Sequence, residues 1–99
     1  MTEDFIREFQ DYFDYEGWML ICERQELSEK FLEEFKYKID WNKISTYQKL
    51  SVPFIERYKE WVNWNNIFRF QKFNTIEWDY LKRLKNVHID EYGIIQFLK

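Results

Sequence analysis

The chain has 99 residues and a mass of 12.7 kDa, which allows one small domain. Aromatic residues make up 22% of it, and there are only two glycines, one proline and no alanine. This composition excludes a disordered or collagen-like chain, and the single cysteine, Cys22, excludes a disulfide framework. The formal charge of −3 is unevenly spread: residues 1–34 carry 11 acidic and 3 basic residues, whereas residues 35–99 carry 7 acidic and 12 basic ones.

We expect a soluble, cytoplasmic protein with no membrane partner. The first residues are acidic rather than basic, unlike a secretory leader, and the apolar runs are far shorter than the roughly 20 residues of a membrane-spanning helix. Cys22 ends the apolar run 18–22, where a thiol usually behaves as a small buried hydrophobe.

A repeat of about 23 residues determines the predicted architecture. From Thr2, Ser28 and Ser51, the offsets 3, 4, 7, 11, 13, 16 and 19 define 21 positions, and each holds a large apolar or aromatic residue. The three sets are Phe5, Ile6, Phe9, Phe13, Tyr15, Trp18 and Ile21; Phe31, Leu32, Phe35, Ile39, Trp41, Ile44 and Tyr47; and Phe54, Ile55, Tyr58, Val62, Trp64, Ile67 and Phe70. We interpret these residues as the packed seam between units.

A fourth unit begins at Asn74 and follows the repeat less closely. Trp78 and Leu81 are in register, and an insertion of about two residues brings Val87, Ile89, Tyr92 and Ile95 into line. Terminal repeats are often atypical because one of their faces has no neighbour, so we predict that this unit is a C-terminal cap.

The spacing predicts two helices in each unit. Offsets 3, 4, 7 and 11 make one helical stripe, which predicts a first helix of about 11 residues. Its N-cap is Thr2, Ser28, Ser51 or Asn74, Pro53 fits the first turn, and Asn74 with Glu77 resembles a capping box. A shorter second helix is predicted to follow a second set of capping residues, which are Asp14, Asp40, Asn63 and His88.

A β-structure is the competing interpretation, because Ile, Val, Phe, Trp and Tyr all favour strands. The four caps, the scarcity of glycine and the absence of Asn-Gly or Asp-Gly turns favour helices. We therefore predict an all-α domain over residues 1–99, a short solenoid-like array of αα-hairpins. Its four units cover about residues 2–26, 27–49, 50–72 and 73–99.

One stretch of the repeat resembles a known family of short repeats. The pattern Leu50-Ser51-x-x-Phe54-Ile55-x-x-Tyr58, then Asn63-Trp64-x-x-Ile67, then Gln71-Lys72, is similar to repeats arrayed in giant-virus and bacteriophage proteins. The resemblance covers roughly residues 2–72 and implies a viral or phage origin and a helical scaffold, in which case the compartment is the host cytoplasm. By size and origin the chain is also similar to phage anti-defence inhibitors such as anti-CRISPR proteins.

The sequence contains no pattern typical of catalysis, so we predict that the chain is not an enzyme and has no catalytic, cofactor-binding or metal-binding residues. A metal site needs clustered His, Cys or carboxylate ligands, whereas Cys22 and His88 lie 66 positions apart. The two glycines cannot form a phosphate-binding loop. We expect no cofactor.

The acidic N-terminal third is the main functional lead. We predict a non-catalytic protein-binding module that inhibits a host factor, such as a CRISPR-type defence nuclease, by presenting carboxylates to a basic groove. Tyr12 and Trp61 occupy a position that varies between units and are candidate interface anchors. The predicted partner-binding residues are Tyr12, Glu26, Glu29, Glu33, Glu34 and Trp61.

Two alternatives remain open. The basic remainder of the chain interleaves lysines and arginines with aromatic residues, and Lys49 and Lys72 recur at equivalent positions, so a nucleic-acid-binding accessory protein is one alternative. A structural module that self-associates through exposed aromatic residues is the other.

The core assignment makes one prediction about stability. Replacing either seam tryptophan, in Trp41→Ala or Trp64→Ala, is expected to lower the free energy of unfolding by about 3–5 kcal/mol, because a large apolar side chain leaves a cavity behind. Urea unfolding measures this loss, and an unchanged midpoint in either variant contradicts the assignment.

Overall fold

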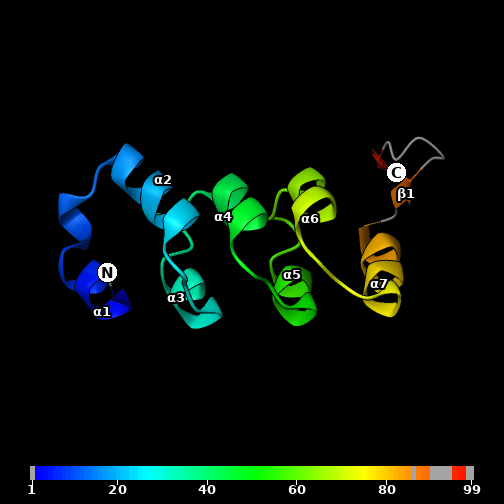
Figure 1. Cartoon of the computed structure of the whole chain (residues 1–99), viewed down its shortest axis with the longest axis horizontal. Helices are drawn as coiled ribbons and strands as arrows, with labels where there is room; N and C mark the ends of the chain where they lie inside the picture. The colour runs from blue at the N-terminus through cyan, green and yellow to red at the C-terminus, as the bar shows by residue number, and fades with distance from the viewer. Residues whose placement is uncertain (1, 86, 90–94, 98–99) are drawn as a thin grey trace.

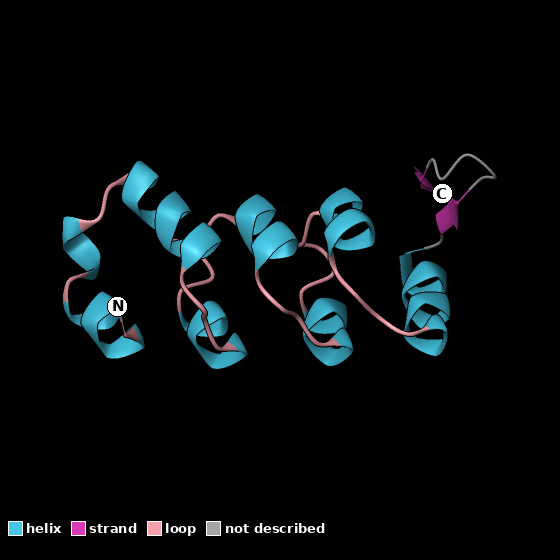
Figure 2. Cartoon of the chain, in the orientation of Figure 1, coloured by secondary structure: helices cyan, strands magenta, loops and turns pink. Residues whose placement is uncertain are grey.

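The computed structural model describes residues 2–85, 87–89 and 95–97. Up to Lys85 this described chain is helical, which confirms the predicted all-α class for that part. The body is elongated, 46 × 22 × 22 Å, and its helices lie in two rows along the long axis (Figures 1 and 2). Its radius of gyration of 14.7 Å exceeds the roughly 13 Å of a compact domain of this length.

The chain alternates between the two rows (Figure 1). One row holds α1 (Glu3–Glu8), α3 (Glu29–Glu34), α5 (Val52–Arg57) and α7 (Thr75–Lys85), and the other holds α2 (Tyr15–Arg24), α4 (Trp41–Tyr47) and α6 (Trp64–Phe70). A 3₁₀ turn, η1 (Gln10–Tyr12), precedes α2. Helix α4 packs against both α2 and α6, and α5 packs against α7. We refer to α1–α2, α3–α4 and α5–α6 as the three helix pairs.

The predicted caps are present. The side chains of Thr2, Ser28 and Ser51 each accept a hydrogen bond from the backbone N–H three residues later. In the second helix of each pair, the caps Asp14, Asp40 and Asn63 do the same for the first turn. Asn74 and Glu77 form a reciprocal capping box with N···O distances of 3.1 and 2.8 Å. These bonds satisfy N–H groups that a helix start leaves unpaired.

The first helices are shorter than predicted. Helices α1, α3 and α5 have six residues each, and not about 11. After α3 the chain makes one further turn, in which the N–H groups of Lys38 and Ile39 both donate to the carbonyl of Phe35, and the same turn follows α5. This turn keeps Ile39 and Val62 on the buried side. A longer helix and a short helix with a turn therefore give the same spacing in the sequence.

The fourth unit differs from its prediction. Helix α7 has 11 residues, and β1 (Val87–Ile89) follows where a second helix capped by His88 is predicted. Strand β1 pairs antiparallel with β2 (Ile95–Phe97), and His88 lies opposite Gln96. The helix and the capping role of His88 are therefore wrong. Tyr92, which the sequence places on the same stripe, lies outside the described residues.

Most of the 21 seam positions form one continuous core, but four do not. The buried ones are Ile6, Trp18, Ile21, Phe31, Leu32, Phe35, Ile39, Ile44, Phe54, Ile55, Tyr58, Val62, Trp64 and Ile67. Phe9, Phe13 and Trp41 are half-buried. The four exposed residues are Phe5, Tyr15, Tyr47 and Phe70, for which the prediction of a packed position is wrong.

An insertion in the first helix pair explains the exposure of Tyr15. Helix α2 has ten residues, whereas α4 and α6 have seven, so α2 begins almost one turn earlier. Trp18 packs on Phe35 with ring centroids 5.5 Å apart, just as Trp41 packs on Tyr58 at 5.4 Å. Trp18 therefore occupies the place of Trp41, and Tyr15 is displaced into solvent.

Glutamine side chains connect each helix pair to the one before it. Gln48, which is buried, donates its amide hydrogens to the carbonyls of Cys22 (2.9 Å) and Gln25 (2.6 Å) and accepts from the N–H of Leu27 (3.0 Å). Gln71 makes the same three contacts one pair further on, with Ser45, Gln48 and Leu50. Each glutamine thus satisfies backbone groups where the preceding helix pair ends, which is the end of α2 for Gln48 and the end of α4 for Gln71.

Glutamates reinforce two of these junctions. The carboxylate of Glu3 accepts from both the N–H (2.6 Å) and the hydroxyl (3.0 Å) of Ser28. Glu29 accepts from Ser51 in the same way, at 2.6 and 2.9 Å. Position 52 is a valine, so the third junction has no such glutamate, and the Asn74–Glu77 capping box holds the start of α7 instead.

The glutamine contacts predict a specific loss of stability. Gln48→Ala is expected to lower the free energy of unfolding by about 1–3 kcal/mol, because two carbonyls and one N–H lose their partner in a buried place. Gln25→Ala is the matched control, since Gln25 ends α2 as Gln48 ends α4 but its side chain makes no hydrogen bond among the described residues. Its free energy of unfolding should change by less than about 0.5 kcal/mol. If urea unfolding shows the same loss of free energy in Gln48→Ala and Gln25→Ala, the hydrogen bonds of Gln48 do not contribute to stability.

Candidate functional site

Chemically reactive groups are not gathered into a site in the described part of the chain. Cys22 is fully buried, and burial raises the pKa of its thiol to about 11, so the thiol is protonated at neutral pH. Among residues 2–85, 87–89 and 95–97, no three His, Cys, Asp or Glu side chains are grouped as metal ligands. None of the described helices is long and apolar enough to cross a lipid bilayer.

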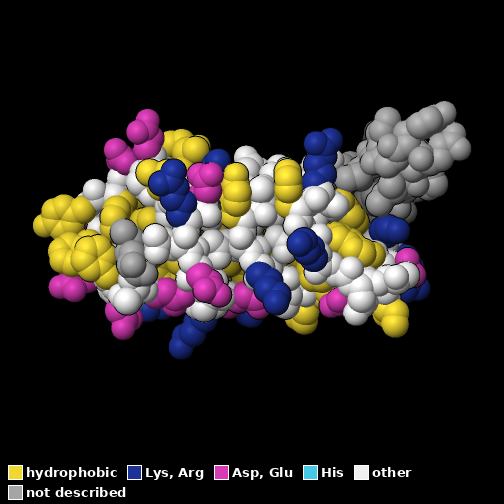
Figure 3. All heavy atoms as spheres, in the orientation of Figure 1, with side chains coloured by type: hydrophobic (Ala, Val, Ile, Leu, Met, Phe, Trp, Pro, Cys, Tyr) yellow, Lys and Arg dark blue, Asp and Glu magenta, His cyan; other side chains and the backbone are white. Residues whose placement is uncertain are grey.

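The most exposed aromatic surface lies at the N-terminal end of the body, and we call it the N-terminal aromatic patch. It consists of Phe5, Phe9 and Tyr12, of which Tyr12 is 83% exposed. Tyr15 is 72% exposed as well, but its hydroxyl reaches the carboxylate of Asp40 in the next helix pair (3.5 Å). The rings of Phe5 and Phe9 are 4.7 Å apart, and those of Phe9 and Tyr12 are 5.8 Å apart. Figure 3 shows hydrophobic side chains gathered at this end, with acidic side chains above and below them.

Local structure fixes where these rings point. Helix α1 carries Phe5 and Phe9 one turn apart, and the N–H of Tyr12 donates to the carbonyl of Phe9 (2.9 Å) in the 3₁₀ turn. Tyr15 begins the additional turn of α2. The repeat predicts that Tyr12 is an exposed anchor and that Phe5 and Tyr15 lie in the core, so it is wrong for the last two. The longer first unit, with 26 residues from Thr2 to Ser28 against 23 in the next, is the sequence signal for the displacement of Tyr15.

The predicted acidic residues divide into free and engaged ones. Glu26 is exposed and makes no ion pair among the described residues. Glu29 is bound to Ser51, whereas Glu33 pairs with Arg57 at 3.1 Å and Glu34 pairs with Arg7 at 3.0 Å. The last two pairs cross between neighbouring helix pairs, so these carboxylates already have a partner within the body, although exposed pairs of this kind add little stability.

Other carboxylates at the N-terminal end are less constrained. Glu8 and Glu16 are exposed and form no ion pair in the described chain, and Asp14 caps α2 while remaining exposed. Asp11 lies 3.5 Å from Lys38 but is 92% exposed. The acidic surface predicted from the sequence is therefore present, and the aromatic patch lies within it. The acidic N-terminal third of the sequence predicts a role for Asp11, Asp14 and Glu16 here, whereas Glu8 is not predicted.

Trp61 is less available than Tyr12. It is 37% exposed and packs in a cluster with Tyr37, Trp41 and Tyr58, with ring centroids 5.4, 5.5 and 6.1 Å away. The Lys36 ammonium lies 6.0 Å from its ring centroid. The structure does not bring Trp61 together with Tyr12, since they follow α5 and α1, and α3 lies between these two helices in the row (Figure 1).

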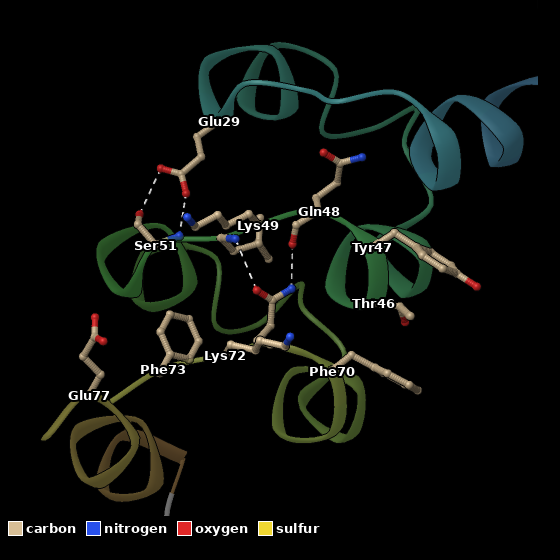
Figure 4. Close-up of a pocket in the computed structure, with 12 residues that line it drawn as sticks. Glu29, Thr46, Tyr47, Gln48, Lys49, Ser51, Phe70, Lys72, Phe73 and Glu77 are labelled. Carbon is tan, nitrogen blue, oxygen red and sulfur yellow. Dashed lines mark hydrogen bonds between the residues drawn. The ribbon is translucent and has the colours of Figure 1, made fainter. Parts of the chain in front are cut away.

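A groove of about 730 Å³ lies between the ends of α4 and α6 and the starts of α5 and α7 (Figure 4). Lys49 and Lys72 line it, and the half-exposed rings of Tyr47 and Phe70 project from neighbouring helices along one side. Glu29 and Glu77 also line the groove, each bound to a capping residue. The recurrence of Lys49 and Lys72 signalled this surface in the sequence, whereas Tyr47 and Phe70 were assigned to the core.

Comparison with known proteins gives no relative to guide the assignment. No protein-family model, curated protein or solved structure matches this chain. The functional argument therefore rests on the two surfaces described above.

Proposed function

We propose that the chain is a short array of αα-hairpin units that binds a protein partner, without catalysis, through its acidic N-terminal end. The observation that carries the proposal is the N-terminal aromatic patch set among exposed carboxylates. Tyrosine is enriched at interface hot spots because it combines a large apolar area with a polar tip. A ring of carboxylates around such an anchor favours a partner with a basic surface.

The resemblance to viral and phage repeats suggests which partner has such a surface. A host protein that holds nucleic acid, such as a CRISPR-type defence nuclease, carries a basic groove for phosphates. Carboxylates of the acidic end would take the place of those phosphates, while Tyr12 buries its ring. In this proposal the chain inhibits its target by competition and works in the cytoplasm of the host.

The contacts of the carboxylates determine which variants test the proposal. Glu29, Glu33 and Glu34 each contact a neighbouring helix pair, so changing them would alter contacts within the body as well as its surface. Glu8 and Tyr12 are exposed and lie outside those contacts, so Glu8→Lys/Tyr12→Ser alters the surface alone. Glu60→Lys/Tyr37→Ser is a matched control, because Glu60 is exposed, Tyr37 is 82% exposed with one face on Trp61, and the two residues follow α5 and α3 rather than α1.

We expect immobilised wild type and control to capture the same host proteins, and a short double-stranded DNA to release them. The Glu8→Lys/Tyr12→Ser variant should bind the captured protein at least tenfold more weakly, because it loses an aromatic anchor and reverses a charge. Mass spectrometry identifies the proteins, and titration of the purified partner gives the affinity. Equal binding by all three forms refutes a contact at the acidic end.

The groove supports a second candidate function, the binding of single-stranded nucleic acid. Lys49 and Lys72 are exposed and repeat along the groove, where they are placed to contact successive phosphates, and Tyr47 and Phe70 offer rings for bases. The overall charge of −3 and the two glutamates in the groove weigh against it, so we rank it second.

Fluorescence anisotropy with a labelled single-stranded oligonucleotide tests this second function. If the groove is the site, Lys49→Ala/Lys72→Ala weakens binding and makes the slope of log K against log salt shallower by about 1.4, because two phosphate contacts are lost. Lys30→Ala/Lys59→Ala is the control, since both lysines are exposed and lie outside the groove. An affinity that falls equally in both double variants would place any binding elsewhere.

A further inference from the structure

The junctions between helix pairs reveal what the N-terminal aromatic patch is shaped to receive. At each of the two inner junctions an aromatic pair of one helix is covered by a tryptophan from the preceding helix pair. Phe31 and Phe35 are 4.6 Å apart with Trp18 beside Phe35, and Phe54 and Tyr58 are 4.8 Å apart with Trp41 beside both. These four covered rings are at most 6% exposed.

Phe5 and Phe9 form the same pair without its cover. Their centroids are 4.7 Å apart with an interplanar angle of 40°, against 36° for Phe31–Phe35 and 43° for Phe54–Tyr58. Phe5 is nevertheless 46% exposed. The N-terminal end therefore presents a receiving surface of the kind that takes a tryptophan at each inner junction.

The charge at this end indicates what accompanies the tryptophan. At the first junction Arg7 pairs with Glu34, and at the second Glu33 pairs with Arg57. The two pairs use equivalent positions. One member lies five positions after the N-cap of its own first helix, and the other lies six positions after the N-cap of the first helix in the next pair. Glu8 holds the second of these positions at the N-terminal end. An incoming helix would therefore bring an arginine or lysine to Glu8.

Gln25 and Tyr12 complete the surface. Gln25 ends α2 as Gln48 and Gln71 end α4 and α6, and those two glutamines donate to backbone carbonyls of the helix pair before them. Tyr12 lies on Phe9 at 5.8 Å as Trp61 lies on Tyr58 at 6.1 Å, and Trp61 also contacts the covering Trp41. Gln25 is thus placed to donate to backbone carbonyls of a preceding hairpin, and Tyr12 is placed to contact a covering tryptophan.

We infer that the N-terminal end docks a helical hairpin of a partner protein, and that this hairpin carries a tryptophan for Phe5–Phe9 and a basic residue for Glu8. This inference rests on the proposed binding function and specifies the partner's contact element. A second copy of the chain fits less well, because two ends that each carry Asp4, Glu8, Asp11 and Glu16 would repel each other.

The chain itself supplies a probe with the required features, since residues 2–27 contain Arg7 and Trp18. A second copy of residues 2–27 is fused directly before Thr2, which offers the hairpin at high effective concentration. If it docks, urea unfolding remains a single transition, and the m-value rises by about one quarter because more surface is exposed on unfolding.

Two substitutions make the result specific. Trp18→Ala in the added copy should return the m-value and midpoint to those of the unmodified chain, whereas Tyr15→Ala there should leave the gain intact. Phe5→Ser in the original copy should abolish the gain and change the midpoint of the unmodified chain only slightly, since Phe5 is half exposed. An unchanged m-value in the fusion, or a gain that survives Trp18→Ala or Phe5→Ser, overturns the inference.

Light scattering of the unmodified chain tests the other occupant. A mass that rises with concentration and becomes monomeric in Phe5→Ser would assign the surface to a second copy, against the inference; a constant monomer mass agrees with it. The fusion needs no host partner. Docking of the added copy without capture of a basic host protein would therefore reject the proposed function alone, and the reverse result would reject the hairpin alone.

Discussion

The stack depends on the side-chain hydrogen bonds that Gln48 and Gln71 make to the preceding helix pair, which we call the glutamine bridges. Helices of six or seven residues have nearly all of their backbone groups at their ends, where an α-helix leaves four N–H and four C=O groups without partners. Gln48 and Gln71 each satisfy two such carbonyls on the preceding pair and one N–H of the linker that follows it. A seven-residue helix is too short to be stable by itself in water. Its neighbours therefore complete it, and each helix pair depends on the next.

Much of this architecture could be predicted from the sequence because its cause is local. A capping hydroxyl and a helical stripe act within a few residues, so Ser28, Asp40 and Asn63 identify helix starts correctly. The role of Gln48 could not be predicted, because its partners lie 21 to 26 residues away. The exposure of Tyr47 could not be predicted either, since an apolar period does not show whether a neighbour covers that position.

The candidate surfaces were harder to locate than the core for a related reason. The position of Tyr12 varies between units, which predicts an exposed anchor, whereas Phe5 holds a repeated apolar position, which predicts the core. That prediction is right for its equivalents Phe31 and Phe54 and wrong for Phe5. The difference lies in what precedes each pair. A repeat in sequence shows which surfaces match, and only the structure shows which of them lacks a neighbour among the described residues.

The distribution of charge gives the body two surfaces of opposite sign. Equivalent positions in successive units hold Glu26, Lys49 and Lys72, while the side-chain bonds of Gln48 and Gln71 remain the same. Electrostatic interactions between exposed charges are screened over about 8 Å at physiological ionic strength, so each surface acts mainly on what binds it directly. Because the bridges fix the backbone, exposed positions are free to differ between units, and one scaffold can carry two surfaces of opposite charge.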